Sequence, residues 1–557
     1  MARDIKFYRS LKQNLESVRD RYVGLWTLIA SVLGRNESYG KLGQITFAES
    51  DTLDHNAYDP SCKRAVETVC DYYASLVFPT QNPFEIMPFA KNNPTQNDYD
   101  WFLKQSQKLV DALYNGKSGF LEVKPVFYRD WDTFGTAAFF VTEQNDDECP
   151  FVVQEFGIDS MAIQDGSNSQ PEYAVLAFNW YPQVIVDYFG KDLYGKLPQD
   201  VRSEYESGDW DTQHMLYCVI HKNPDYNPKA KLGKARAKFK AVWFFENDEQ
   251  IFAENEFFEN PLAVSRYARI RGEVYGRSDV SNFINTVAAI NGIIYLAYKS
   301  MSKMADPAIA IYDNALSNDT EIDTDAGAIV ALDSTFASAA NPIVPIQDIG
   351  DPSKLCDVLL TFLRDELAKA FKLDIILPIV QTNAMTATEF VNRLALQSEV
   401  LSGVLSRHLA QLAGFYERII GICTRRAGFF DFENAPEYVK KAIANGEKWY
   451  VVKYNNSITN IMNSSAQRDF VNTLNTVMMA AQIDQSIAPD IDLYDSVLAI
   501  VKDSVLKNAL PTKTEHQQNK AARQMQMAQA QQAQIANLQS QTNRNNAQAN
   551  NLVQPMV

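Results

Sequence analysis

Two pairs of closely spaced aspartates are the residues of this chain whose type and spacing could do chemistry. Asp130 stands with Asp132, and Asp209 stands with Asp211. Paired carboxylates of this kind bind Mg²⁺ in nucleases. No third acid or lysine stands at a recognisable spacing from either pair, so a metal-dependent nuclease is only a minor alternative interpretation.

The sequence shows no other motif of catalysis or metal binding. Gly116-Lys117-Ser118 has the end of a phosphate-binding loop, but that loop needs a glycine five residues before Gly116, and Asp111 stands there. The six cysteines are scattered without Cys-x-x-Cys pairs, and the five histidines lack metal-binding spacing. We therefore expect no enzymatic activity, no cofactor and no metal, and we expect reduced, mostly buried thiols.

The composition is that of a globular protein with room for several domains, since 46% of the 557 residues are hydrophobic and 22% are charged. The longest apolar run, Val287 to Tyr298, is too short to span a bilayer and contains Asn291 and Gly292. The first residues are charged and lack the apolar core of a signal peptide. We expect no membrane contact, and we expect the protein to be made and kept in the cytoplasm.

The formal net charge of −16 argues against a surface that grips nucleic acid widely, because phosphate affinity comes from Lys and Arg. It is compatible with a protein past which DNA slides. One basic run departs from this balance, and on a strand it would place four positive charges on one face. A solvated hairpin face and a contact to nucleic acid or to an acidic neighbouring subunit are both open for this run, which consists of Lys229, Lys231, Lys234, Arg236, Lys238 and Lys240.

Two long amphipathic helical patterns bracket a short β-rich insert in the middle of the chain. The first runs from Ser278 to about Met304, the insert covers 305–350, and the second runs from Asp351 to about Leu373. At 1.5 Å per residue the two helices reach roughly 39 and 30 Å. Two helices that run out and back around a small cap form a stalk, which indicates assembly rather than catalysis.

Apolar stripes define the faces that the two helices bury. The first stripe consists of Val280, Phe283, Ile284, Val287, Ile290, Ile294, Tyr298 and Met301, and the second of Leu355, Val358, Leu359, Phe362, Leu363 and Phe371. The insert holds three strand candidates, at Ala308 to Tyr312, Ala328 to Leu332 and Ile343 to Gln347. Three short strands make a weak fold alone, so we expect neighbouring subunits to pair with them.

The N-terminal part is predicted to combine helices with strands. Helical spacing covers Asp4 to Leu33 and Pro60 to Val77. From Leu121 to Phe258 the texture becomes β-rich or α+β. Strand candidates there are Ala137 to Val141, Tyr173 to Phe178, Met215 to Ile220 and Ala241 to Phe245.

The C-terminal part begins with a third long helix, from Thr386 to about Arg426. Thr386 with Glu389 fits a capping box, and Met385 with Phe390 fits a hydrophobic staple. A mixed helical segment follows from Glu433 to Leu510, interrupted by a strand at Lys448 to Tyr454. From His516 onward the tail holds 12 Gln, 7 Asn and no acid, which predicts either disorder or a helix that orders only in an oligomer.

With these elements in place, the chain resembles the portal proteins, or head-to-tail connectors, of short-tailed bacteriophages. Three stretches carry the resemblance. They are Tyr275-Gly276-Arg277-Ser278-Asp279, the segment Ala384 to Arg393 with Met385, Thr386, Thr388, Glu389 and Arg393, and Tyr454 to Arg468 with the polar tail beyond.

The resemblance implies a mixed α+β, mainly helical portal fold assembled as a ring of twelve subunits. Its segments would be a wing at 1–277, stem helices at 278–304 and 351–373, and a clip between them at 305–350. A tunnel loop would follow at 374–385, a long wing helix at 386–426, a crown at 427–510, and a C-terminal barrel or flexible tail at 511–557. The ring would occupy one vertex of the capsid in the virion.

The resemblance also implies partners: further copies of the chain, double-stranded DNA in the channel, the large terminase subunit, tail adaptor or nozzle proteins, and the major capsid and scaffolding proteins. DNA would be packaged and later ejected through the ring. Candidate channel residues are Lys299, Lys303, Lys369 and Lys372 on the stem, and Gln381, Thr382 and Asn383 at the loop tip. Each lysine could instead face solvent or form a salt bridge between subunits. Another virion component, a tail adaptor or an internal core protein, stays the main alternative.

Overall fold

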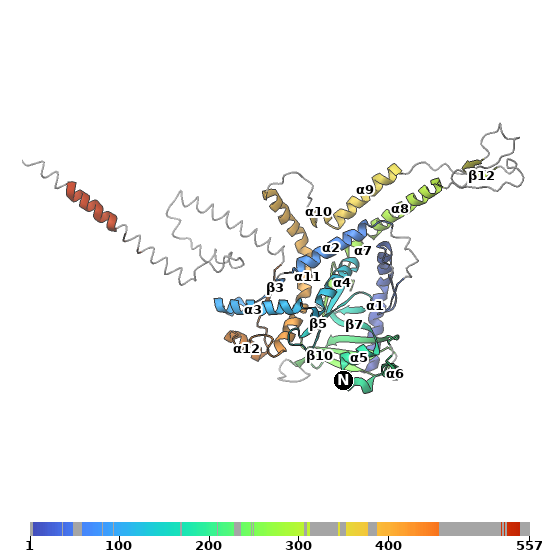
Figure 1. Ribbon diagram of the computed structural model, residues 1–557, viewed down its shortest axis with the longest axis horizontal. Helices are drawn as coiled ribbons and strands as arrows, with labels where there is room; N and C mark the ends of the chain where they lie inside the picture. The colour runs from blue at the N-terminus through green and yellow to red at the C-terminus, as the bar shows by residue number, and fades with distance from the viewer. Residues whose placement is uncertain are drawn as a thin grey trace, which may run out of the picture. The chain divides into compact units, whose positions relative to one another are not determined.

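The computed structural model consists of two compact units, Met1–Ile461 and Met462–Val557, which are treated separately (Figure 1). The structure describes residues 4–35, 37–47, 58–80, 82–92, 94–167, 170–208, 210–227, 236–246, 248, 250–305, 309–311, 343–345, 353–376, 387–455, 525, 529 and 532–545. Side chains are described over most of these ranges, but not for 38, 46–47, 90, 303–311, 343–345, 353–355, 375 and 387–400.

The first unit is built on a five-stranded antiparallel sheet in the order β10-β9-β8-β7-β6. Its strands are β6 (Met161–Asp165), β7 (Pro171–Trp180), β8 (His214–Lys222), β9 (Phe239–Phe245) and β10 (Ala253–Phe257), which confirms the strand predictions in this region. Val175, Val219 and Val242 stand in register and face α1 (Ile5–Val32), whereas the neighbouring residues in each strand face the main core. The sheet is therefore buried on both faces, as period-two alternation of side chains requires.

A second antiparallel sheet, in the order β11-β4-β5, lies between helices. Its strands are β4 (Thr136–Glu143), β5 (Phe151–Phe156) and β11 (Leu262–Arg266). The helix α4 (Phe120–Phe134) contacts β4 and β5, and α11 (Ala387–Arg425) contacts all three strands. The β-rich texture predicted from Leu121 thus begins with a helix, because Phe120, Phe127, Trp131 and Phe134 repeat at three- and four-residue spacing.

Smaller elements complete the body. They are β1 (Glu37–Tyr39) paired with β2 (Ile45–Phe47), α2 (Ser61–Val77), β3 (Phe84–Met87), α3 (Gln96–Leu113), α5 (Pro182–Phe189), α6 (Gln199–Ser207), and the 3₁₀ turns η1 (Ala90–Asn92), η2 (Gly116–Ser118) and η3 (Lys191–Lys196). Sequence reasoning did not predict α3, although Thr95 and Asp98 form a capping box at its start.

The long helix α11 is fixed to the body by buried polar contacts. His408 lies between Tyr128 of α4, whose hydroxyl is 3.0 Å from Nε2, and Ser265 of β11, whose Oγ is 2.7 Å from Nδ1. Burial lowers the pKa of His408 to about 3, so the ring is neutral. Because Ser265 donates to Gln411, the geometry is satisfied when His408 donates to Ser265 and accepts from Tyr128. These hydrogen bonds join α4 and β11 to α11.

Residues after α11 return to the N-terminal half of the unit. Helix α12 (Glu437–Asn445) is followed by β14 (Val451–Tyr454), which pairs with β3. Trp101 of α3 donates to the carbonyl of Asp431 at 2.8 Å, and Trp449 packs against Trp101. The described beginning of the segment 427–510 therefore belongs to the same compact unit as the first 277 residues.

The predicted helix, insert, helix arrangement is confirmed, with shifted boundaries. It consists of α7 (Asp279–Asn282), α8 (Ile284–Ala305), the antiparallel pair β12 (Ile309–Ile311) and β13 (Ile343–Pro345), α9 (Ser353–Ala370) and α10 (Leu373–Ile376). The first helix is interrupted at Phe283, and the loop predicted from 374 begins with the short helix α10. The strand candidate Ala328 to Leu332 lies outside the described residues.

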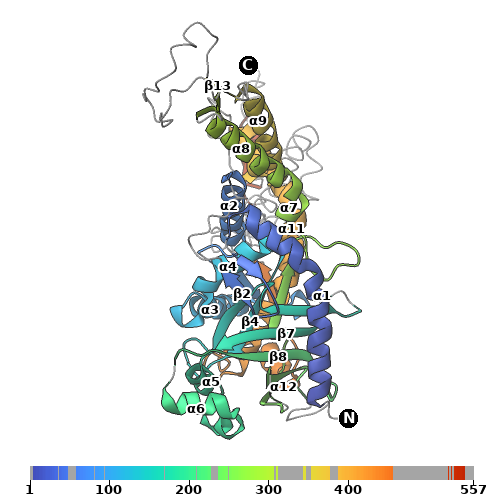
Figure 2. The ribbon, with the colours of Figure 1, turned by 90° about the vertical axis from the view of Figure 1, so that its right-hand side faces the viewer.

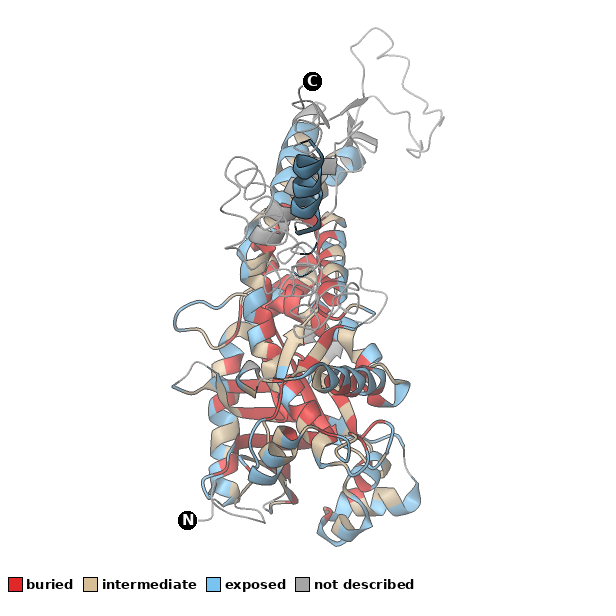
Figure 3. Cartoon of the chain, turned by 90° about the vertical axis from the view of Figure 1, so that its left-hand side faces the viewer, coloured by how far each residue is buried: buried red, intermediate tan, exposed pale blue. Residues whose placement is uncertain are grey.

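Helices α8 and α9 lie side by side and extend away from the sheets (Figure 2). Buried residues fill the sheets and the helices around them, while exposed residues dominate the far parts of α8 and α9 (Figure 3). No helix in the described ranges is long and apolar enough to cross a membrane. The six cysteines are free thiols, five of them buried, as expected.

Little of the second unit is described. A helix covers 532–545, and its apolar side chains Ile535 and Leu538 are exposed. This agrees with the helical alternative for the polar tail at these residues. The rest of the tail and most of Tyr454 to Arg468 lie outside the described residues.

Candidate assembly site

The stretch Tyr275 to Asp279 fixes the point where the helix pair leaves the body. Tyr275 is buried, with its ring against Trp26 and Tyr22 of α1 and its hydroxyl 3.3 Å from the backbone of Met161. Ser278 caps α7 by accepting from Ser281 N at 3.1 Å, and it donates to the carbonyl of Thr133 at 2.6 Å. The first helical turn is thereby tied to the end of α4.

Gly276 lies where two backbone segments meet without room for a side chain. A Cβ on Gly276 would lie 2.2 Å from the carbonyl oxygen of Gly135, the αL residue that ends α4. Gly276 N also donates to Thr136 Oγ1 at 2.8 Å. Glycine at 276 is therefore required by the close approach of the chain to Gly135 and not by its own φ angle.

Lys372, at the junction of α9 and α10, turns toward the body. It adopts a positive φ of 56°, and its Nζ lies 3.5 Å from Asp279 Oδ2. Tyr267 donates its hydroxyl to the same Asp279 oxygen at 2.5 Å. This contact closes the base of the helix pair, because Lys372 follows α9 and Asp279 begins α7.

A second polar contact joins both helices to α2 and the end of α1. The buried Asn291 of α8 accepts from Asp59 N at 2.7 Å and donates to the carbonyl of Val32 at 3.3 Å. Arg364 of α9 donates to both carboxylate oxygens of Asp59, at 3.1 and 3.2 Å. Although burial raises the pKa of Asp59, the hydrogen bonds from Arg364 and Ser61 hold it below its ordinary value.

Beyond these contacts the apolar stripes continue without cover in the subunit. The parts next to the body are buried, as predicted, at Val280, Ile284, Val287, Ile290 and Phe371, and Leu367, which the predicted stripe lacked, is buried with them. Phe283 departs from the prediction, since it is 38% exposed. The parts far from the body are exposed: Leu296 at 61%, Tyr298 at 70% and Val358 at 72%, together with Tyr295, Met301, Leu359 and Phe362. Val358, Leu359 and Phe362, on the predicted buried face of α9, are therefore exposed in the single subunit, where α8 is the main neighbour of α9 among the described elements.

We call these seven exposed side chains the outer apolar face: Tyr295, Leu296, Tyr298, Met301, Val358, Leu359 and Phe362. Singly exposed apolar residues are ordinary on protein surfaces, but seven exposed large apolar side chains close together on two adjacent helices are not. Such a face indicates a protein interface.

The predicted channel lysines have different surroundings. Lys299 is exposed on α8, with its Nζ 5.8 Å from the ring centroid of Tyr295. Lys369 pairs with Glu366 at 3.0 Å, and Lys372 is engaged by Asp279. The side chain of Lys303 and the residues Gln381, Thr382 and Asn383 lie outside the described part of the chain. Whether any of these lysines contacts DNA stays a prediction.

The motif positions at the start of α11 are described only by their backbone. The helix begins at Ala387. Met385 and Thr386 lie outside the described residues, and the side chains of Thr388, Glu389 and Arg393 are not described. In the first motif, Arg277 donates to Glu273 at 2.7 and 2.9 Å.

The paired aspartates do not converge on one site. Asp130 lies 3.7 Å from Arg35, and burial raises its pKa to about 7. Asp132 is fully buried on another side of α4, near Cys70. Asp209 lies outside the described residues, and across those that are described no three His, Cys, Asp or Glu side chains are placed to hold a metal ion.

The remaining charged motifs are engaged in ion pairs. Lys117, in the turn η2, pairs with Asp146 at 2.9 Å and with Glu148 at 3.1 Å. Of the basic run, Lys240 pairs with Glu254 of β10 at 2.8 Å. Lys229, Lys231 and Lys234 lie outside the described residues, so neither interpretation of the run is tested.

Sequence reasoning missed the residues that anchor the helix pair: Asn291, Asp59, Arg364 and Tyr267. One signal was available, since Asn291 is the polar residue inside the longest apolar run, and a buried amide must be hydrogen-bonded. Nothing in the sequence pairs Asp59 with Arg364, because 305 residues separate them.

Two buried carboxyls near the base should respond to pH in opposite ways. Burial, and then the nearby Asp279 carboxylate, raise the pKa of Asp132 well above its ordinary value. Above about pH 4 the Asp132 carboxyl stays protonated in the folded protein but loses its proton in the unfolded chain. Asp132 therefore lowers the free energy of unfolding as the pH rises. Asp59, with a lowered pKa, contributes stability above about pH 4 and loses it as the pH falls.

We therefore expect Asp132→Asn to raise stability at pH 7 and Asp59→Asn to lower it by about 1–3 kcal/mol, because Asn cannot pair with Arg364 as a charge. The difference for Asp132→Asn should shrink toward pH 4, whereas the difference for Asp59→Asn should persist at about pH 4 and shrink only below it, as the pH falls through the lowered pKa of Asp59. Urea unfolding of the two variants at pH 7, at about pH 4 and at about pH 3 checks this. A destabilised Asp132→Asn at pH 7 would show that Asp132 is ionised in the folded protein.

Fold and site together define a structural class: an α+β body that carries a two-helix projection with an uncovered apolar face. The family model described as bacteriophage head to tail connecting protein matches residues 6–503. The chain belongs to this family, whose members connect the head of a bacteriophage to its tail. The resemblance drawn from the sequence is confirmed at this level.

Individual relatives are distant. The portal protein of Salmonella phage epsilon15 is 24% identical over 197 residues, so the match spans about a third of each protein, 34% in both cases. Among solved structures, a chain from the neck of an empty gene transfer agent particle matches 70% of this chain and 90% of its own length, with a TM-score of 0.35 and 12% identity. A chain from the virion of a native gene transfer agent particle matches 73% and 96%, with a TM-score of 0.31 and 13% identity.

Proposed function

We propose that this chain is the portal subunit of a bacteriophage virion and that twelve copies form a ring at one capsid vertex. DNA enters through the ring, driven by the terminase, and leaves through it at ejection. Tail adaptor or nozzle proteins attach at the insert 305–350, and capsid and scaffolding proteins contact the body. Membership in the head-to-tail connecting family supports this proposal.

The outer apolar face is the observation that best supports a ring. In a cyclic assembly each contact is heterologous, so one surface of a subunit meets a different surface of the next. Helices α8 and α9 both expose apolar side chains. In the proposed ring, the exposed residues of one helix would therefore contact one neighbouring copy, and those of the other helix would contact the copy on the opposite side. Burying such side chains between copies contributes roughly 1.5–3 kcal/mol for each large residue.

The charges of the two helices support a lining past which DNA moves. Helix α8 contains Lys299 and Lys303 and no acidic residue, whereas α9 is neutral overall. Its three acids, Asp357, Asp365 and Glu366, are balanced by Lys354, Arg364 and Lys369. A few lysines among neutral side chains touch phosphates without the dense contacts that hold DNA in place. In this proposal α8 contributes the positive side chains of the channel.

Single-particle images of the purified chain test the ring. Axial views with a central hole and one consistent subunit number are the expected result. Uniform monomers at high protein concentration would refute the proposal. Incubation of the same preparation with DNA and Mg²⁺ should leave the DNA intact, and cleavage would favour the nuclease interpretation.

Lys299 gives the cleanest test of contact with DNA. Lys299→Glu should leave the stability of the subunit within about 0.5 kcal/mol of the original, because the side chain is exposed. It should reduce the length of DNA packaged in an assembly assay. Lys104→Glu, an exposed lysine on α3, is the matched control. Equal lengths of packaged DNA for both variants would show that Lys299 does not contact DNA in the channel.

Lys372→Glu tests a different property. It would place a second carboxylate beside Asp279 and so weaken the closure of the helix pair. A packaging defect in this variant counts as evidence for a DNA contact only when its melting temperature is unchanged.

A further inference from the structure

The two-stranded pair β3–β14 leaves one strand edge open. On the β3 side, Ile86 N donates to Ser106 Oγ of α3 at 2.8 Å. The edge of β3 that faces away from β14 is therefore closed by α3, and only the far edge of β14 can receive another strand.

The register shows which backbone groups point to that edge. Val452 stands opposite Ile86. In an antiparallel pair, opposed residues either exchange both hydrogen bonds or turn both groups away from each other. The backbone N–H of Ile86 points toward Ser106 and not toward β14. The backbone N–H and carbonyl of Val452, which stands opposite Ile86, therefore point away from β3. Asn455 N donates to Pro83 O at 3.0 Å, which fixes the odd-numbered residues of β14 as those bonded to β3.

Val452 and Tyr454 thus present their N–H and carbonyl groups at the far edge. Within the described residues, no hydrogen bond engages the backbone N–H of Val452. An open row of this kind pairs readily with an added strand.

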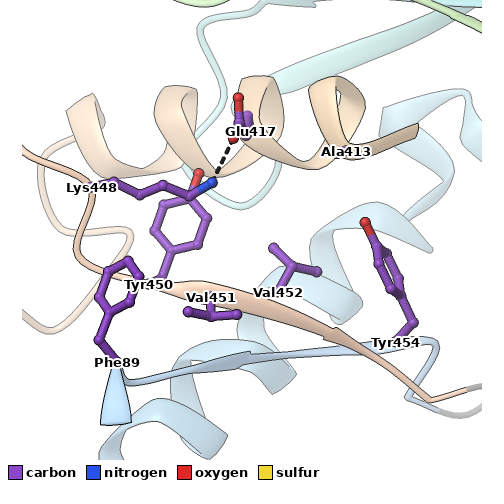
Figure 4. A pocket seen from close by; sticks show the side chains of 8 residues that line it. All are labelled: Phe89, Ala413, Glu417, Lys448, Tyr450, Val451, Val452 and Tyr454. Carbon is purple, nitrogen blue, oxygen red and sulfur yellow. Dashed lines mark hydrogen bonds and ion pairs between the residues drawn. The ribbon is translucent and has the colours of Figure 1, made fainter. Parts of the chain in front are cut away.

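A groove of about 330 Å³ lies along this edge, between β14 and α11. Figure 4 shows Tyr450, Val452 and Tyr454 pointing from β14 toward α11, where Ala413 leaves space opposite them. Tyr454 donates to the carbonyl of Leu409 at 3.3 Å, which holds that end of the groove together. The volume is at the lower end of the range for ligand sites, roughly 300–1,000 Å³, and fits a few side chains.

One end of the groove carries two lysines, although the chain as a whole carries −16. Lys448 reaches Glu417 at 2.5 Å and stays 48% exposed. Lys91 is exposed, with its Nζ 5.2 Å from the ring centroid of Phe89. Phe89, Tyr450 and Lys448 lie together at this end (Figure 4). Two lysine side chains are therefore available at this end, one of them beside the Glu417 carboxylate.

We propose that this groove accepts an extended segment of a partner protein as a third strand beside β14. The segment carries apolar side chains at alternate positions, which enter the groove, and acidic residues at the end that meets Lys91 and Lys448. Backbone hydrogen bonds to Val452 and Tyr454 hold it, and the lysines set its direction. The inference is independent of the ring and of DNA.

A labelled peptide of alternating valine and threonine with two glutamates at one end, titrated into the full-length protein with anisotropy as the readout, tests the proposal. Saturable binding is expected. The same peptide N-methylated at alternate residues should bind at least about tenfold more weakly, because it cannot pair with the strand edge. Binding that does not saturate, or equal binding of both peptides, would overturn the proposal.

Two variants locate the site. Val452→Pro removes an N–H that faces the open edge and leaves the pairing with β3 intact, which edge strands tolerate. Ala413→Leu fills the groove from α11. Each should weaken binding at least tenfold with an unchanged melting temperature, and Ala413→Leu decides the matter if Val452→Pro does not fold. Unchanged affinity in Ala413→Leu would refute the site.

Lys91→Glu tests the charge. It should weaken binding of the acidic peptide severalfold at low salt and leave a glutamine version of the peptide unaffected. An equal effect on both peptides would contradict the predicted direction of the strand. A change in oligomeric state in Val452→Pro would show that a second copy of this chain, and not a separate partner, occupies the groove.

Discussion

Leu296→Asp and Val358→Asp are each expected to convert assembled rings into free subunits without lowering the melting temperature of the subunit. Both side chains are more than half exposed in the single chain, so aspartate costs little there. In the ring they would lie between copies. The variant then loses roughly 1.5–3 kcal/mol of apolar burial at every interface and must also bury a carboxylate.

Mass photometry or sedimentation velocity checks this result, with thermal unfolding measured in parallel. Leu103→Asp is the matched control, since Leu103 is 53% exposed on α3, outside the helix pair. Rings that persist in both Leu296→Asp and Val358→Asp would show that the outer apolar face is not the contact between copies. The ring proposal would then lose its structural support.

Gly276→Ala is expected to lower the stability of the subunit by about 3 kcal/mol or more. The new Cβ would lie 2.2 Å from the carbonyl oxygen of Gly135 and 3.0 Å from Cβ of Arg266. Neither backbone segment can move freely, because Gly276 N bonds Thr136 and Ser278 bonds Thr133. Overpacking against fixed backbone is among the costly substitutions.

Gly292→Ala in α8 is the control for Gly276→Ala. Nothing lies within 4 Å of the Cβ position at Gly292, so alanine should stabilise the helix by roughly 0.5–1 kcal/mol. Chemical unfolding of both variants gives the comparison. Equal stability of Gly276→Ala and the parent would mean that the two backbone segments separate at low cost.

The two experiments address different parts of the helix pair. The base, with Gly276, Asp279 and Asn291, is satisfied inside one subunit, so changes there act on folding. The outer apolar face is unsatisfied in one subunit, so changes there act on assembly. A variant that disturbs both properties equally would contradict this division.

The amino-acid sequence by itself determined the long helices α1, α2, α8, α9 and α11, most of the strands of the large sheet, and the helix, insert, helix arrangement. These depend on local periodicity, on caps such as Ser278 and on the glycine of the Tyr275 to Asp279 motif, all of which lie within a few residues of each other. The same stretches carried the resemblance to the connector family. The helix α3 was missed although its capping box was visible in the sequence.

Only the tertiary structure decided how the helix pair is anchored and where its burial ends. Asp59, Asn291 and Arg364 come from three distant parts of the chain and form hydrogen bonds with one another through Asp59. Lys372 reaches Asp279 because its own backbone adopts a positive φ, which hydrophobic periodicity cannot predict. Both halves of α8 have the same apolar stripe, yet Ile290 is buried and Tyr298 is exposed. A stripe shows that a face needs cover, but whether the cover comes from the same chain depends on which elements the fold brings beside it.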